Sequence, residues 1–150
     1  MVTPPPTIYF DYNATTPLDP QVRAAMLPFL DEVWGNPSSV HHVGRRARAL
    51  LDDARDRCAA VLGCKGSEVV FTSGGTESSN LAVFGTARLL RDKGRHLITS
   101  SIEHHAVLHC FDHLERREGF TVTRLPVDST GRLRVDDLRR ALRPDTTLVS

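Results

Sequence analysis

Two short segments carry residues whose types and spacing suit the binding of a phosphorylated ligand. The first, residues 73–77, reads SGGTE and follows an apolar run that is typical of a β-strand. Glycines let a backbone approach a ligand closely, and the unpaired N–H groups at a helix start favour an anion. Thr76 can add a hydroxyl donor. The segment predicts a cup for one terminal phosphate, although a tight strand-to-helix turn without a ligand has the same composition.

Two common phosphate-binding loops are excluded by the letters themselves. The sequence contains no G-x-x-x-x-G-K-[ST] for a nucleoside triphosphate and no G-x-G-x-x-G for a dinucleotide.

The second segment, HLITSSIEHHAVL, reads as another strand, loop and helix. It places Glu103 and His104 just beyond the expected strand, at the edge of a parallel sheet where ligands bind. A histidine there can lie flat against a planar ligand and offer its nitrogens for proton transfer. Alone, His104 also fits a polar residue that starts a helix. Together with the phosphate cup, it indicates a planar phosphorylated cofactor.

The elements that position these residues alternate along the chain. We expect strands at 68–72, 96–99, 121–125 and from 147, and helices at 76–91, 104–117 and 135–142. Before them, Asp19 is expected to cap a first helix, Ser38 or Ser39 a second, and Gly63 to end the second. The pattern predicts an α/β fold with a mostly parallel sheet and helices on both faces.

Composition limits the classes of partner. The 150 residues have a net charge of +1, with 40% hydrophobic and 25% charged residues, which is typical of a soluble globular protein. Neither nucleic acid nor a membrane is an expected partner. With no leader-like start and three unpatterned cysteines, we expect a cytoplasmic protein. Because the last residues, DTTLVS, read as an opening strand, we also expect a fragment.

Five blocks together resemble one enzyme family. They are YFDYNATTPLDP, GNPSSVHHVGRRAR, VVFTSGGTESSNLAVFG, HLITSSIEHHAVL and LRPDTTLVS, in this order and over nearly the whole chain. The sequence resembles the cysteine desulfurases, pyridoxal 5'-phosphate (PLP) enzymes of the class V aminotransferase group. The resemblance implies the PLP-dependent transferase fold, normally as a homodimer. Residues 1–18 would be an arm bordering the active site, and 19–150 the first part of the PLP-binding large domain.

The resemblance also implies roles for residues at matching positions. Gly75 and Thr76 would hold the cofactor phosphate, and His104 would stack on the pyridine ring and assist proton transfers. Two further groups follow by position: Asn13, Ala14 and Thr15 bordering the substrate pocket, and His41, Gly44 and Arg45 near its mouth. For these two groups a purely architectural role is an equal alternative.

The implied reaction removes sulfur from L-cysteine. The PLP ring acts as an electron sink for the Cα proton, and an enzyme cysteine thiolate takes the sulfur, which gives L-alanine and an enzyme persulfide. A sulfur-acceptor protein would then receive it for iron–sulfur cluster assembly or thio-modification.

Several residues that this chemistry needs are not expected within the chain. Lys65 and Lys93 read as exposed loop lysines, and neither matches the family's cofactor lysine, which belongs to a later segment, as does the nucleophilic cysteine. We therefore expect residues 1–150 alone to lack desulfurase activity. An alternative is a non-catalytic truncated relative or a subunit that pairs with a complete one.

A less favoured alternative is a histidine-rich metal-binding domain. His105, His109 and His113 recur on one helical face. Histidines at i and i+4 can share a zinc ion, but residues eight apart span about 12 Å of helix, too far for one ion. A solvated face is the better interpretation, so no metal is expected.

Overall fold

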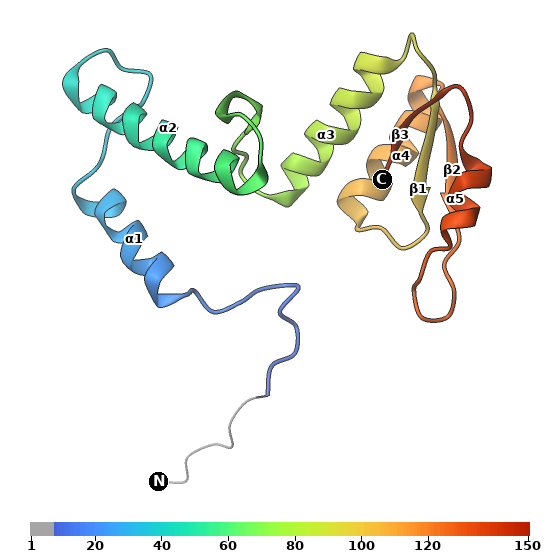
Figure 1. Ribbon diagram of the computed structural model, residues 1–150, viewed down its shortest axis with the longest axis horizontal. Coiled ribbons are helices and arrows are strands. Elements are labelled where there is room, and N and C mark those ends of the chain that lie inside the picture. The colour runs from blue at the N-terminus through green and yellow to red at the C-terminus, as the bar shows by residue number, and fades with distance from the viewer. Residues whose placement is uncertain (1–7) are drawn as a thin grey trace. The chain divides into compact units, whose positions relative to one another are not determined.

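The computed structural model describes residues 8–150, which divide into one unit that ends at Val70 and a second, Phe71–Ser150 (Figure 1). The predicted division into residues 1–18 and 19–150 stays a prediction. Within the described part of the chain, no helix has the length and apolarity that a membrane crossing requires.

The first unit contains two α-helices, α1 (Pro20–Asp31) and α2 (His42–Leu62), and a short 3₁₀ helix, η1 (Gly66–Glu68). Asp19 caps α1 as predicted, because its Oδ1 accepts from the N–H of Gln21 at 2.7 Å. Gly63 ends α2 in the left-handed conformation, with a φ of 68°, as the sequence indicates.

The predicted start of α2 was wrong by two to three residues. His41, not Ser38 or Ser39, is the N-cap, and its Nδ1 accepts from the N–H of Gly44 at 3.4 Å. The two serines instead belong to a turn around Asn36, which accepts from both of their N–H groups. Serine is a common N-cap residue, but Ser38 and Ser39 belong to this turn, and α2 begins only after it.

The strand predicted at 68–72 is also wrong. Glu68 closes η1, and residues 69–72 adopt no regular structure. A strand forms only by pairing with a neighbour, and no strand within residues 8–150 pairs with this segment. The apolar run therefore indicated the segment's β propensity but not its pairing.

The second unit contains a three-stranded parallel sheet in the order β2-β1-β3. Its elements are α3 (Gly75–Leu90), β1 (His96–Ser100), α4 (His105–Glu118), β2 (Thr121–Leu125), α5 (Val135–Ala141) and β3 (Thr146–Val149). Each lies within one residue of its predicted bounds. The α/β fold with a parallel sheet is confirmed.

Helices pack on the sheet in the manner of a doubly wound fold. Helix α4 connects β1 to β2 and packs on both, while α3 packs on α4 and β3. The connection from β2 through α5 to β3 runs in the opposite direction across the sheet. Because such crossovers are right-handed, α5 covers the face opposite α4 (Figure 1). Helix starts and strand ends therefore meet at one edge of the sheet.

The apolar core of this unit lies between α3, α4 and β1. Leu97, Phe111 and Leu114 are fully buried. The buried cluster consists of Val83, Ala87, Leu97, Cys110, Phe111, Leu114 and Phe120. Because α3 contributes its middle and α4 its central turns, this core fixes the two helices side by side on the sheet.

A buried histidine joins all three strands. His96 in β1 bonds through Nδ1 to the hydroxyl of Thr146 in β3 at 2.7 Å, and through Nε2 to that of Thr123 in β2 at 2.8 Å. A neutral imidazole can donate at one nitrogen and accept at the other. Burial lowers the pKa of His96, and the positive charge of Arg143 lowers it further, against a smaller opposing effect of Asp145.

We predict that His96 makes the unit less stable in acid. Its pKa is lower in the folded chain than the roughly 6.5 of an unfolded histidine. The free energy of unfolding should thus keep its full value above that pH. It should fall as the pH drops toward the folded pKa, by up to about 1.4 kcal/mol per pH unit. Denaturant titrations between pH 8 and 5 measure this slope.

The matched variants for this test are His96→Gln and His109→Gln. An amide also donates and accepts but does not titrate, so H96Q should flatten the slope over this range. His109 is exposed, and H109Q should retain it. An unchanged slope in H96Q would assign the pH dependence to another group.

Two glycines should respond to alanine in opposite directions. A Cβ on Gly94 would lie 2.2 Å from the carbonyl oxygen of Asp145, whereas a Cβ on Gly85, inside α3, meets nothing within 4 Å. We expect Gly94→Ala to destabilise by about 1–3 kcal/mol because backbone must shift. Gly85→Ala should stabilise by about 1 kcal/mol through helix propensity. Thermal unfolding of both variants measures the difference, and equal effects would contradict it.

Candidate functional site

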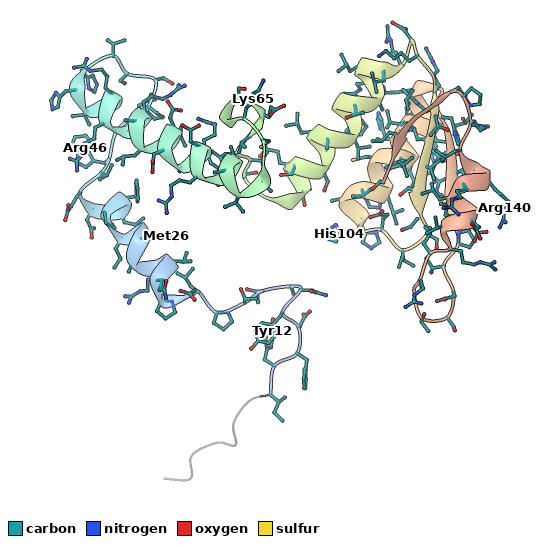
Figure 2. The ribbon with its side chains drawn as sticks, in the orientation of Figure 1. Tyr12, Met26, Arg46, Lys65, His104 and Arg140 are labelled. Atoms are coloured by element: carbon teal, nitrogen blue, oxygen red, sulfur yellow. The ribbon has the colours of Figure 1, made fainter. Side chains whose placement is uncertain are left out.

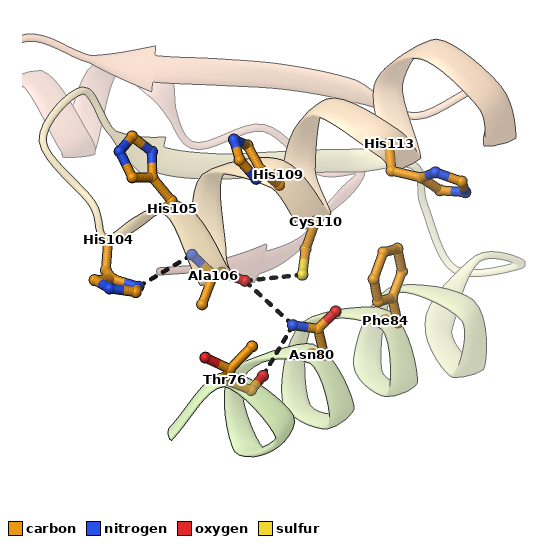
Figure 3. A pocket seen from close by; sticks show the side chains of 9 residues that line it. All are labelled: Thr76, Asn80, Phe84, His104, His105, Ala106, His109, Cys110 and His113. Carbon is orange, nitrogen blue, oxygen red and sulfur yellow. Dashed lines mark hydrogen bonds between the residues drawn. The ribbon is translucent and has the colours of Figure 1, made fainter. Parts of the chain in front are cut away.

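A cavity of about 460 Å³ lies between α3 and α4 in the second unit. Its lining comes from the two helices and from the residue before α4 (Figure 3): Thr76, Asn80, Phe84, His104, His105, Ala106, His109, Cys110 and His113. Thr76 and His104 stand at the starts of their helices, at the carboxyl edge of the sheet. This is the edge at which α/β folds bind ligands.

The start of α3 has free backbone donors. Its N-cap, Gly74, provides no side chain, and the first backbone bond of the helix runs from the N–H of Ser78 to the oxygen of Gly74 at 3.1 Å. The amides of Gly75 and Thr76 precede that bond. A Cβ built on Gly74 or on Gly75 would meet nothing within 4 Å. The packing of the chain therefore does not require either glycine, and the backbone stays open to a ligand.

Glu77 stabilises the turn that leads into α3. Its Oε2 accepts from the N–H of Ser73 at 2.7 Å and from the hydroxyl of Ser73 at 2.6 Å. These bonds lower the pKa of Glu77, the hydroxyl bond having the larger effect. Sequence reasoning treated the segment as a glycine turn and did not assign Glu77 a role. A serine with an acid four residues on, across a helix start, was the available signal.

His104 is the N-cap of α4. Its backbone is extended, with φ −60° and ψ 146°, and its Nδ1 accepts from the N–H of Ala106 at 3.1 Å (Figure 3). Because Nδ1 is an acceptor, the neutral ring carries its proton on Nε2. The side chain is exposed, so Nε2 is available to a ligand or to proton transfer. The helix-cap interpretation and the catalytic one are therefore compatible at this residue.

The other three histidines of α4 have neighbours but do not form a metal site. The rings of His105 and His109 stack with centroids 5.4 Å apart. The ring of His113 meets Phe84 edge to face at 5.5 Å, and its Nε2 lies 3.4 Å from the carboxylate of Glu118. Within residues 8–150, no group of three histidine, cysteine or acidic side chains is arranged to hold a metal ion. The described residues therefore give no support to the metal-binding alternative.

Of the residues predicted for cofactor binding, Thr76 and His104 line one cavity, and Gly75 directly precedes Thr76. Their roles toward a cofactor stay predictions. Residues 13–15 belong to the first unit, where the N–H groups of Ala14 and Thr15 bond to the oxygen of Asp11 in an exposed turn. The substrate-pocket roles of Asn13, Ala14 and Thr15 likewise stay predictions.

The residues expected near the mouth of the site have a local architectural role in the first unit. A Cβ on Gly44 would lie 2.3 Å from the oxygen of Ser39, so the preceding loop packs on bare backbone. The guanidinium of Arg45 donates to the oxygen of Val40. With His41 as N-cap, these residues build the start of α2.

Neither lysine lies in the cavity. Lys93 follows the far end of α3, and a 16-residue helix is about 24 Å long. Lys65 precedes η1 in the first unit (Figure 2) and is not among the residues that line the cavity. Cys110 is buried, which raises its thiol pKa and makes it a poor nucleophile.

A family model described as "Aminotransferase class-V" matches residues 8–150. The chain belongs to the class-V aminotransferase family.

Among its relatives, cysteine desulfurase IscS of Dictyoglomus turgidum is 53% identical over 143 residues, which are 95% of this chain and 36% of that protein. A solved structure titled "NIFS-LIKE PROTEIN" aligns with a TM-score of 0.87 at 41% identity, over 95% of this chain and 39% of the other. Another, titled "SspA in complex with cysteine", gives 0.85 at 40% identity, over 95% and 41%. The chain thus spans little more than a third of the relatives that it matches.

The residues present fit the phosphate and ring of PLP, the cofactor of this family. The open backbone at Gly74 and Gly75, with no side-chain cap, suits a dianionic ester at a helix start. The imidazole of His104 borders the same cavity as Thr76. The cofactor's lysine has no candidate among the lining residues. The lining therefore offers groups suited to the phosphate and the ring, but no residue for the Schiff base.

We predict that Gly75→Ala will separate folding from ligand binding. Its added methyl group meets no atom of the chain, and alanine favours a helix, so the melting temperature should hold or rise slightly. If the amides of this turn contact a phosphate, the methyl group should obstruct it and weaken PLP binding several-fold. Absorbance titration and thermal unfolding measure the two effects. Unchanged affinity would show that this glycine serves only the turn.

Proposed function

We propose that this chain is the N-terminal part of a PLP-dependent cysteine desulfurase that converts L-cysteine to L-alanine and passes the sulfur on as an enzyme persulfide. In this proposal it acts in the cytoplasm as a homodimer. An acceptor protein takes the sulfur for iron–sulfur cluster assembly or thio-modification.

One observation carries the proposal: an uncapped helix start and a histidine with an available Nε2 border a single cavity. They do so in a chain 53% identical to a cysteine desulfurase over almost its whole length. The neighbour titled "SspA in complex with cysteine" supports L-cysteine as the substrate. All three cysteines are free, which is compatible with a reducing compartment.

The chain's own residues divide the work between holding and proton transfer. The amides of Gly75 and Thr76, the hydroxyl of Thr76 and the dipole of α3 would bind the phosphate ester and so hold one end of the ligand. PLP, when bound, supplies an electron sink that makes the Cα proton of the amino acid acidic. The imidazole of His104, whose Nδ1 accepts from the N–H of Ala106, would contact the cofactor ring and could move a proton at Nε2.

Sulfur transfer balances without a further reactant. A cysteine thiolate attacks the substrate sulfur, the C–S bond breaks as the S–S bond forms, and a proton completes L-alanine. The enzyme thiol and L-cysteine thus become a persulfide and L-alanine. The buried Cys110 is unsuited to this attack. We propose that the nucleophile and the cofactor lysine lie in a part of the protein that follows residue 150.

We predict that His104→Asn in the protein expressed in full from its gene will lower kcat about 100-fold or more, through loss of the proton-transfer group. Asparagine is a good N-cap, so the start of α4 should persist and the melting temperature should change little. L-Alanine and persulfide released from L-cysteine in the presence of PLP measure the rate.

The wild-type protein and residues 1–150 alone complete this experiment. We expect turnover by the full protein and none by the isolated segment, which lacks a cavity lysine. A full protein that binds PLP but releases no L-alanine would support the non-catalytic or pairing-subunit alternative. H104N with wild-type kcat would remove His104 from the chemistry.

A further inference from the structure

The side-chain amide of Asn80 links the starts of α3 and α4. Its Nδ2 donates to the oxygen of Thr76 in its own helix at 2.8 Å and to the oxygen of Ala106 in α4 at 3.5 Å (Figure 3). One amide nitrogen has two hydrogens, so it can serve both acceptors at once. Asn80 is partly buried, and it lines the same cavity as Thr76 and His104.

On the α4 side, the same residue that Asn80 contacts also holds the imidazole. The N–H of Ala106 donates to Nδ1 of His104 at 3.1 Å, while its oxygen accepts from Asn80. Hydrogen bonds that are joined through the backbone of Ala106 therefore connect the first turn of α3 to the ring of His104 (Figure 3).

The fully buried residues of the apolar core do not reach this end of the helix pair, although the partly buried Val107 packs against that core. The buried core residues of α3 are Val83 and Ala87, and those of α4 are Cys110, Phe111 and Leu114. All lie at least one turn beyond Thr76 and Ala106. In the described part of the chain, the amide of Asn80 provides the hydrogen bond between the two helix starts.

We propose that Asn80 is a positioning residue that sets the spacing between the backbone amides at Thr76 and the imidazole of His104. A ligand with a phosphate at one end and an aromatic ring at the other then meets both at once. This inference rests on the proposed function for its ligand. Asn80 contacts no reacting atom itself. Asn80 instead affects the coupling between binding of the ligand's phosphate and binding of its ring.

The test uses three probes that form no covalent bond with a lysine, on the protein expressed in full: pyridoxine 5'-phosphate, pyridoxine and inorganic phosphate. Calorimetry or ligand fluorescence gives each Kd. The coupling is the product of the Kd values for pyridoxine and phosphate divided by the Kd for pyridoxine 5'-phosphate. It measures how well one site presents both halves of the ligand.

Asn80→Leu keeps the size of the side chain and removes both donors. We expect it to lower the coupling about two- to tenfold, the range for one lost hydrogen bond. The Kd values for pyridoxine and for phosphate alone should change little. Asn80→Ala, which leaves space in place of leucine, is analysed in the same way, and ligand-free melting temperatures show that each variant is folded.

The matched control is Cys110→Ala. The thiol of Cys110 donates to the same oxygen of Ala106 at 3.1 Å, but from within α4, so it does not link the helices. C110A removes a bond to this carbonyl and should leave the coupling unchanged. A loss of coupling as large as that in N80L would show that any disturbance of Ala106 suffices, and would overturn the role of Asn80.

The outcomes separate this inference from the proposed function. Wild-type protein in which the three probes show no coupling overturns the proposed function. Wild-type coupling that both Asn80 variants retain overturns only the role of Asn80, as does a parallel weakening of all three Kd values. Coupling lost in N80L and N80A and retained in C110A supports it.

Discussion

The shared apolar core between α3, α4 and β1 is the constraint on which the site depends. Leu97 and Phe111 are fully buried in it, together with Val83 and Ala87 of α3. Since α3 leads into β1 and α4 follows it, packing α3 on α4 and β3, and α4 on β1 and β2, brings the two helix starts to the same edge of the sheet. An uncapped helix start and a capping histidine thus come to border one cavity without any direct bond between them.

Polar contacts add to the positioning of strands and helix starts that the apolar core provides. His96 bonds the middle strand to both neighbours, and Asn80 connects the two helix starts at the cavity. Glu77 holds the preceding turn by accepting from the backbone and the hydroxyl of Ser73. Each adds side-chain hydrogen bonds to the backbone or to a neighbouring element.

The sequence predicted most of this fold because its signals were local. Asp19 before Pro20, Gly63 after an amphipathic run and the β-branched stretch 121–125 each specify an element by themselves. The failures involved competition or partners. Ser38 and Ser39 belong to a turn at Asn36, so α2 begins only after them, and residues 69–72 have no strand to pair with in the described part of the chain. At the site, Thr76 and His104 stood out by type. Asn80 and Glu77 did not, because their roles follow from three-dimensional neighbours.

The central claim is that the amides of Gly75 and Thr76 and the imidazole of His104 bind one and the same ligand. Nuclear magnetic resonance on isotope-labelled protein during a titration with pyridoxine 5'-phosphate tests it most directly. The account predicts that the two amide signals and the His104 ring signals shift together and saturate with a single Kd. Amides that respond while the His104 ring signals stay fixed, or signals that saturate at different concentrations, would contradict it.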